Sequence, residues 1–577
     1  MRREVFVLSV SEEKYDYRME FGVKVPMRDG VKLAATIVRP DAEGRFPVIL
    51  TTTPYSSLGG PEQTKEQFDQ AKFFAKRGYV LMAADCRGKN DSEGDYFYPL
   101  AHEAEDGYDT IEWAGTQPWS SGMVGTRGGS YSGWNQWLPA ILRPPHLKTM
   151  VSFVTPPDPF YMLPYLNGTV NLYLACWIPC VEGRRNHSLA EYDDILKILK
   201  HRPIITMDEA FGWTSRFWRD WIRHSTYDDY WRRLSYQDKF HEIEVPVLHV
   251  TGWYDDNGNI GNHWNFIGMR EHGRTETARG GQKLVVGPWT HGVNRSKEIH
   301  GFDFGPDALI DMNALLLRWY DHWLKGLDTE IMGEPPVSIF VMGENSWRQE
   351  KEWPLARTEY TEFYLHSGGR ANSLHGDGGL SDAPPGEEPP DRFAFDPDNP
   401  VPMVIYDPSS PMGAVDPGGP DDQRPVERRD DVLVYTGEVL DGEVEVTGSV
   451  KGRLYAASDC VDTDFTMKLV DVFPNGYAMK LVDGVIRARF RESYERPTLL
   501  EPGRIYGYDI DLWYTSNLFK RGHRIRVEVS SSQFPKSDPN PNTGNPIGMD
   551  AEVRIAQQTI YHDGARPSHI ILPIIPR

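Results

Sequence analysis

Cysteine is scarce in this chain, with only Cys86, Cys176, Cys180 and Cys460 in 577 residues. Four cysteines are too few for a disulfide framework in a protein of this size. Cys176 and Cys180 have the spacing of one helical turn, which suits a pair or a metal ligand set, but no cluster of His or Cys completes a zinc site. We therefore expect buried free thiols.

Positive charge is also in short supply. Lys and Arg total 62 against 83 Asp and Glu, which leaves a formal net charge of −21 and a pI near 5.3. Such a charge repels phosphate backbones and anionic lipid headgroups. We expect no nucleic acid and no membrane as partner, and the charge itself is more typical of a solubility device than of a clue to the substrate.

Long apolar runs are missing as well. The apolar run near the N-terminus has about four or five residues, whereas the apolar region of a secretory signal needs roughly 7 to 15. Nothing further along approaches the ~18 apolar residues of a membrane span. The sequence therefore predicts a soluble, cytoplasmic protein.

The chain does hold enough apolar material for several cores, because it is 39% hydrophobic and contains 17 Trp and 28 Tyr. A chain of this length is too long for a single core. Over residues 1–155 and again over residues 242–333, short apolar runs alternate with helical segments. This alternation indicates an α/β class with parallel strands that are buried on both faces.

Two other regions break this alternation. Residues 156–241 are helical and rich in aromatic side chains, which is typical of a cap inserted between strands of a sheet. Over residues 334–577, short alternating runs that begin with VSIFVMG are separated by turn residues. This pattern predicts a β-sandwich of the jelly-roll type.

The segment Gly128-Gly129-Ser130-Tyr131-Ser132-Gly133 lies between a predicted strand and a predicted helix. A sharp turn at this place exposes a serine hydroxyl and needs small neighbours, as in the nucleophile elbow G-x-S-x-G. Ser132 stands where that motif has its second glycine, and Gly133 follows one place later. Ser130 is the candidate nucleophile, and a glycine-rich helix entry is the alternative interpretation.

A serine hydroxyl needs a base, and the base needs a carboxylate that orients it. Asp255 ends the apolar run VPVLHVTGWY, and His291 follows LVVGPWT. Both side chains should project from the carboxyl edge of the sheet, where function collects in such folds. Taken alone, each fits an ordinary loop residue, but the order Ser130, Asp255, His291 is that of the α/β-hydrolases.

Acyl transfer also needs donors for the oxyanion that develops in the transition state. The backbone N–H of Tyr131, directly after the candidate nucleophile, is the expected first donor. The phenol of Tyr55, which follows the strand FPVIL, is a candidate for the second. A tyrosine beside a proline is more often a packing residue, so Tyr55 stays a hypothesis on this basis alone.

Several motifs together resemble the CocE/NonD hydrolases, relatives of the X-Pro dipeptidyl peptidases that include cocaine esterase, α-amino acid ester hydrolases and glutaryl acylases. They are GGSYSGW, the pair Pro54 and Tyr55, DCRG followed by SEGD, GWYD and GPWTHG, with DDVLVYTGEVL, DTDFTMKLVDV and GVIRARFRES in the β region. The resemblance covers nearly the whole chain. It implies an α/β-hydrolase core with an inserted helical cap, followed by a β jelly-roll C-terminal domain.

The resemblance also implies a serine hydrolase of small-molecule esters or amides that works through an acyl-enzyme without metal or organic cofactor. The triad would be Ser130, Asp255 and His291, with the oxyanion hole formed by Tyr131 and Tyr55. Family members that select α-amino acyl groups carry acidic residues two and three places after the catalytic Asp, where this chain has Asn257 and Gly258. A free α-amino group is thus a less favoured handle, although Asp256 offers a partial substitute.

Three alternatives stay open. An X-Pro dipeptidyl peptidase is disfavoured because larger members carry a long helical domain before the core, whereas the first strands of this chain begin near Phe21. A non-catalytic protein that binds carbohydrate or a partner through the jelly roll is the rival from another class, and self-association is left open. Aromatic residues of the cap are candidates either for an acyl pocket or for the cap's own core: Phe160, Tyr161, Tyr165, Trp177, Trp213 and Phe217.

Overall fold

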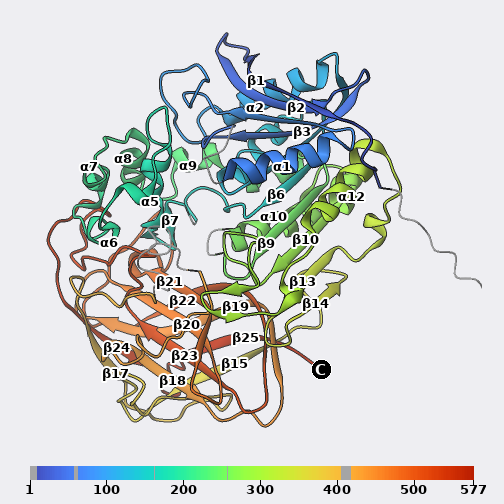
Figure 1. The fold of residues 1–577 in the computed structure, drawn as a ribbon. Coiled ribbons are helices and arrows are strands. Elements are labelled where there is room, and N and C mark those ends of the chain that lie inside the picture. Colours follow the sequence, from blue (N-terminus) through green and yellow to red (C-terminus); the bar gives the residue numbers. More distant parts are fainter. Residues whose placement is uncertain (1–9, 58–62, 162, 256–257, 405–417) are drawn as a thin grey trace, which may run out of the picture.

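The computed structural model describes residues 10–57, 63–161, 163–255, 258–404 and 418–577. Figure 1 shows a sheet with helices at the top, a group of short helices beside it, and an all-β domain below. The core sheet has ten strands in the order β1-β2-β4-β3-β5-β6-β9-β10-β13-β14. Pairing is parallel from β4 to β13 and antiparallel at both ends of the sheet.

The strands of this sheet are β1 (Tyr17–Pro26), β2 (Lys32–Pro40), β3 (Phe46–Thr53), β4 (Val80–Asp85), β5 (Ser120–Gly129), β6 (Leu147–Phe153), β9 (Val247–Gly252), β10 (Gln282–Gly287), β13 (Val337–Val341) and β14 (Ser346–Glu350). Its helices are α1 (Gln63–Ala75), α2 (Glu103–Thr116), α3 (Tyr131–Trp134), α4 (Trp137–Ile141), α10 (Gly258–His272), α11 (Glu276–Gly280) and α12 (Met312–Lys325). The predicted α/β class is confirmed.

Helices cover both faces of the sheet. Successive side chains of a strand point to opposite faces, so neighbouring residues pack against different helices. Val48 and Leu50 of β3 pack in one cluster with residues of α2 and α4. Ile49, which lies between them, packs in another cluster with residues of α1 and α12. Burial on both faces explains why the central strands read as continuous apolar runs.

The segment between β6 and β9 leaves the sheet and forms the helical group on the left of Figure 1. It contains the hairpin β7 (Tyr165–Leu166) and β8 (Thr169–Val170), the helices α5 (Tyr173–Val181), α6 (Ile195–Ile198), α7 (Met207–Ala210), α8 (Arg216–Arg223) and α9 (Asp229–Leu234), and the 3₁₀ turns η1 (Leu189–Glu191), η2 (Ile204–Thr206) and η3 (Gln237–Glu242). We call this segment, residues 156–241, the cap.

The C-terminal part is all β, as expected. Its strands form one extended sheet: β15 (Glu359–His366), β16 (Gly379–Ser381), β17 (Asp391–Phe395), β18 (Leu433–Gly437), β19 (Val444–Ser458), β20 (Asp464–Val472), β21 (Ala478–Arg487), β22 (Tyr506–Phe519), β23 (Arg524–Ser530), β24 (Ala556–Tyr561) and β25 (His569–Ile575). The short elements β11 (Glu298–Ile299), β12 (Phe302–Asp303) and η4 (Pro306–Ala308) lie between β10 and α12 in the chain. The turn η5 (Ile331–Gly333) lies between α12 and β13, and η6 (Ala488–Phe490) follows β21.

One strand of this region pairs outside the C-terminal sheet. The run VSIFVMG falls in the region expected to form the β domain, but its strand β13 pairs in parallel with β10 of the core sheet, with Leu284 opposite Val337. The hairpin partner β14 extends the same sheet. The reason is physical: β10 would otherwise be an open parallel edge, and β13 and β14 cover it. The domain boundaries at 155, 241 and 333 stay a prediction.

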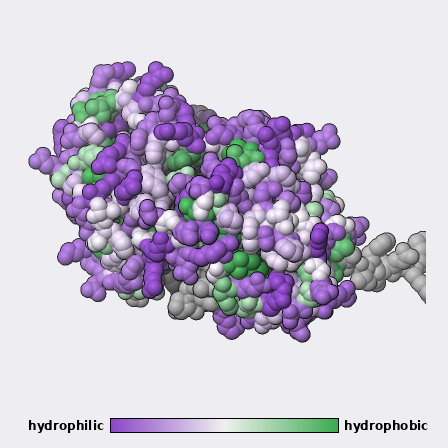
Figure 2. All heavy atoms as spheres, turned by 90° about the horizontal axis from the view of Figure 1, so that it is seen from above, coloured by the Kyte–Doolittle hydropathy of each residue, from purple (hydrophilic) through white to green (hydrophobic). Residues whose placement is uncertain are grey.

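The surface agrees with the acidic, polar composition. Figure 2 shows a face that is largely hydrophilic, with hydrophobic residues in small separate patches. Within the described part of the chain, no helix is both long and apolar enough to cross a membrane. The expectations about nucleic acid, cellular location and self-association stay predictions.

Candidate active site

Ser130 sits at the sharp turn that joins β5 to α3. Its backbone has φ 57° and ψ −125°, a left-handed region that residues with a side chain seldom adopt. The turn is held from both sides, since the N–H of Ser130 donates to the Phe153 carbonyl (3.2 Å) and its own carbonyl accepts from the N–H of Trp134 (2.9 Å).

Two glycines make this turn possible. A Cβ on Gly128 would lie 2.0 Å from the backbone oxygen of Ser132, and a Cβ on Gly133 would lie 2.4 Å from the Thr155 hydroxyl. Neither approach is sterically possible for a residue with a side chain. In the usual motif the second glycine, at the position of Ser132, permits this close packing. Here Gly133 permits it instead, which explains the departure from G-x-S-x-G.

Asp255 and His291 meet at the same edge of the sheet. His291 Nδ1 lies 2.9 Å from Asp255 Oδ1. The Asp255 side chain is fully buried, whereas 27% of the His291 side chain is exposed. A hydrogen bond joins the loops that carry Asp255 and His291, since the N–H of Tyr254 donates to the Trp289 carbonyl at 3.0 Å. A buried carboxylate thus orients an accessible imidazole.

The phenol of Tyr55, two residues after the end of β3, reaches the serine turn. The Ser130 side chain lies close enough to this hydroxyl to lower its pKa. Burial raises the pKa of Tyr55 to about 12, and the hydrogen bond from Trp177 and the nearby Ser130 side chain offset part of that rise. The phenol therefore keeps its proton at neutral pH and is a donor for a negatively charged oxygen.

Trp177 is the cap residue that contacts both expected oxyanion donors. Its indole N–H donates to the Tyr55 hydroxyl at 3.1 Å. Its ring stacks on the ring of Tyr131, with centroids 5.5 Å apart and planes 29° apart. Because a phenol that accepts one hydrogen bond becomes a better donor of its own proton, this contact polarises Tyr55 toward the site.

The six aromatic residues proposed for an acyl pocket fall into two groups. Phe160, Tyr165 and Phe217 are at most 1% exposed and belong to a large buried cluster, so their packing favours the cap's own core. Tyr161, Trp177 and Trp213 are partly buried and lie against that cluster. For all six, the role in an acyl pocket stays a prediction.

Some sequence expectations concern residues elsewhere. Cys176 and Cys180 lie one turn apart on α5, and the thiols of all four cysteines are free, with Cys180 half-buried and the other three buried. Among the described residues, no group of three or more His, Cys, Asp or Glu is arranged to hold a metal ion. Asp256 and Asn257 lie outside the described residues, and Gly258 begins α10.

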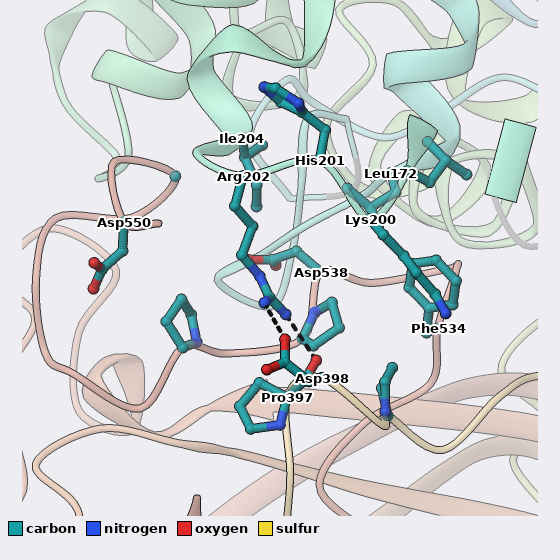
Figure 3. Close-up of a pocket in the computed structure, with 15 residues that line it drawn as sticks. Leu172, Lys200, His201, Arg202, Ile204, Pro397, Asp398, Phe534, Asp538 and Asp550 are labelled. Atoms are coloured by element: carbon teal, nitrogen blue, oxygen red, sulfur yellow. Dashed lines mark hydrogen bonds and ion pairs between the residues drawn. The ribbon is translucent and has the colours of Figure 1, made fainter. Parts of the chain in front are cut away.

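The cavity in Figure 3 is separate from the candidate site residues. It lies between the cap and the β domain, and none of the candidate site residues lines it. Arg202 crosses it to bind the Asp398 carboxylate (2.6 Å) and the Pro397 carbonyl (2.7 Å), as the dashed lines show. The cavity is therefore part of the interface between the cap and the β domain.

Sequence reasoning missed Glu103, whose carboxylate binds the phenol of Tyr131. The distance from Tyr131 Oη to Glu103 Oε1 is 2.5 Å. An acidic residue in the first turn of a helix is common because it complements the helix dipole, so the sequence carried no signal that set Glu103 apart.

Two family models match the chain. The X-Pro dipeptidyl-peptidase (S15 family) model matches residues 29–293, and the X-Pro dipeptidyl-peptidase C-terminal non-catalytic domain model matches residues 329–571. Cocaine esterase of Rhodococcus sp. (strain MB1 Bresler) is 36% identical, over 97% of this chain and 99% of its own length. The chain belongs to the X-Pro dipeptidyl-peptidase (S15) family.

Solved structures with the same fold cover this S15-family chain from end to end. An α-amino acid ester hydrolase has a TM-score of 0.83 at 27% identity, and an aminopeptidase from the marine sediment archaeon Thaumarchaeota archaeon has a TM-score of 0.84 at 27% identity. In both cases the match covers 100% of this chain and 99% of the other. A CocE/NonD family hydrolase of Staphylococcus aureus shares the fold, with a TM-score of 0.69 at 20% identity.

These findings confirm the resemblance to the CocE/NonD hydrolases and the expected fold class. The S15-family chain is an enzyme, a serine hydrolase of the CocE/NonD type. The alternative of a non-catalytic binding protein has no support from any of these relatives.

Proposed function

We propose that this S15-family hydrolase is a serine esterase of small-molecule substrates that works through Ser130, His291 and Asp255. The observation that carries the proposal is the bond between His291 Nδ1 and Asp255 Oδ1 at 2.9 Å. It lies at the sheet edge where Ser130 occupies its strained turn. Cocaine esterase and the α-amino acid ester hydrolase are both named as hydrolases of esters, which supports ester over amide substrates.

In the proposed reaction, His291 Nε2 removes the Ser130 proton as the hydroxyl oxygen attacks the ester carbonyl. The peptide N–H of Tyr131 and the phenol of Tyr55 stabilise the tetrahedral oxyanion. His291 returns the proton to the leaving alcohol as the ester C–O bond breaks, which leaves an acyl group on Ser130. Water, deprotonated by the same histidine, then attacks the acyl carbonyl, and His291 returns the proton to the Ser130 oxygen as the acid leaves. The chain's own residues account for every proton transfer.

The test compares two serine variants of the same motif. Ser130→Ala should lower kcat for a p-nitrophenyl ester by about 10⁴-fold or more, because the nucleophile is lost. Ser132→Ala should retain activity, since Ser132 fills the motif without supplying the nucleophile. Full activity in the Ser130→Ala protein, or loss only in the Ser132→Ala protein, would overturn the proposal.

The family name also includes peptidases, so the wild-type enzyme should be offered an X-Pro p-nitroanilide beside the ester. An esterase is expected to show the higher kcat/KM on the ester by a wide margin. Preference for the anilide would replace the esterase proposal with a dipeptidyl peptidase and leave the three proposed catalytic residues in place.

A further inference from the structure

A buried carboxylate stands directly behind the proposed nucleophile turn. Glu103 is the first residue of α2 and is 8% exposed. Its Oε1 accepts the hydrogen bond of the Tyr131 phenol at 2.5 Å, and the N–H of Leu100 donates to the same phenol oxygen at 2.8 Å. Tyr131 is the residue whose peptide N–H is the proposed oxyanion donor, so Glu103 is one side chain away from the reaction.

Both the ring and the phenol oxygen of Tyr131 are restrained by their neighbours. Its ring, 3% exposed, stacks on Trp177 and meets the edges of Phe97 (5.7 Å) and Trp134 (6.2 Å). The two hydrogen bonds at the phenol oxygen fix the tip of the side chain against α2 and the residues before it.

The charge on Glu103 is sensitive to pH near neutrality. Burial raises the pKa of its carboxyl to about 7, although the hydrogen bond from Tyr131 opposes the rise. Among the described residues, the charged and titratable groups near Glu103 include Asp106 and His102 on the same helix or its cap, Cys86 and Arg87 after β4, Tyr98 before α2, and Tyr131 on α3. Arg87 is already paired with Asp106 at 2.6 Å.

Tyr131 itself does not supply the proton change. Burial and the neighbouring Glu103 carboxylate hold the pKa of the Tyr131 phenol well above its usual value. The phenol therefore stays protonated and donates. Ionised Glu103 receives a charge-assisted hydrogen bond, which is shorter and stronger than a neutral one, and protonated Glu103 does not.

We propose that Glu103 is a positioning residue for catalysis, which holds the Tyr131 phenol and thereby keeps the Tyr131 peptide N–H aimed at the oxyanion. This role rests on the proposed function of the serine turn. Glu103 touches no reacting atom and acts only through Tyr131, so its loss should affect kcat more than KM.

The experiment uses Glu103→Gln, which keeps shape and removes charge, and Tyr131→Phe, which removes the other partner of the bond. Glu105→Gln is the matched control, because Glu105 lies exposed in the same turn of α2. Each of the first two variants should lose about tenfold in kcat with KM nearly unchanged, as expected for a lost hydrogen bond to a charged group. The double variant should lose no more than either single one.

The pH profile separates positioning from a merely structural role. In wild type, ionisation of Glu103 should add a rise in kcat across neutral pH. In Glu103→Gln this added rise should be absent. An unchanged kcat and an unchanged profile in Glu103→Gln would overturn the role of Glu103. If that variant does not fold, the kcat of Tyr131→Phe decides the matter.

Failure of this inference is distinguishable from failure of the proposed function. If Ser130→Ala retains turnover, the serine turn is not the site, and both proposals fall. If Ser130→Ala is inactive while Glu103→Gln and Tyr131→Phe match Glu105→Gln in kcat and in pH profile, only the positioning role is wrong.

Discussion

Two histidine–carboxylate sets in this chain differ in how exposed the imidazole is and in how it is held. In the core, His291 meets Asp255 through Nδ1 and keeps 27% of its side chain exposed. In the β domain, His562 is fully buried, with Nε2 2.9 Å from Asp391 and Nδ1 3.1 Å from Glu388. The first imidazole is oriented by a carboxylate at Nδ1 and is partly exposed, whereas the second is fully buried with a carboxylate at each ring nitrogen.

The β-domain set even includes a serine, yet its geometry is wrong for catalysis. Ser367 Oγ lies 3.1 Å from His562 Nε2, the same nitrogen that Asp391 contacts, and it also donates to Asp391 at 2.8 Å. A general base needs its carboxylate on one ring nitrogen and the nucleophile on the other. The β-domain set shows that contact between Ser, His and Asp does not by itself make a candidate catalytic site.

Parallel substitutions at Asp255 and Asp391 should give the largest difference in kcat between the two sets. Asp255→Asn should lower kcat by about 10⁴-fold, because the amide favours the wrong tautomer of His291. Asp391→Asn should leave kcat on the ester unchanged. Steady-state kinetics on both purified variants measure the effect, and equal losses would mean that the core carboxylate has no special role.

Removal of the β-domain histidine should cost stability and not activity. His562→Ala leaves Asp391 and Glu388 without their shared partner, and loss of one member of a buried ionic set destabilises by about 3 to 5 kcal/mol. Urea unfolding of this variant measures the change, with the exposed His241→Ala as control. A fall in kcat that exceeds the fall in folded fraction would contradict the assignment of His562 to structure alone.

Loss of the Tyr55 hydroxyl should act on the core site at a smaller scale. Tyr55→Phe should lower kcat by about 10² to 10³, the usual effect of removing one oxyanion donor. Tyr192→Phe, whose hydroxyl donates to the Phe211 carbonyl in the cap, is the matched control. Equal kcat in the two variants would remove Tyr55 from the oxyanion hole.

The smallest expected effect is the response of the β domain to pH. Burial lowers the pKa of His562, but the hydrogen bond and charge of Asp391, together with Glu388, raise it overall above its usual value. A raised pKa contributes stability that is complete below the unfolded value of about 6.5 and is lost as pH rises through the folded value. The melting temperature should therefore fall above neutral pH in wild type and fall less in His562→Ala.

The sequence predicted the strand ends well because they follow from local pattern. Short apolar runs end just before Ser130, Asp255 and His291, and the carboxyl ends of parallel strands share one edge. The membership of β13 in the core sheet was not predictable in this way. The residues of β13 alternate like those of the β domain, and only the long-range pairing with β10 places the strand in the core sheet.

Contacts between side chains from different elements were also out of reach. The bond between Glu103 and Tyr131 joins residues 28 positions apart, and the contact from Trp177 to Tyr55 spans 122. Both depend on how the cap and α2 pack on the serine turn. Trp177 was predicted only as a residue of an acyl pocket or of the cap's own core, because an aromatic residue in a cap carries no sign of the hydroxyl that its indole will meet.

The most direct measurement is the site of covalent labelling by a fluorophosphonate, which reacts only with an activated serine. Peptide mapping of the inactivated enzyme should place one adduct on Ser130 and none on Ser367, and Asp255→Asn should slow the labelling. An inactivated enzyme whose adduct lies on another serine, or a fully active enzyme with Ser130 modified, would contradict the account.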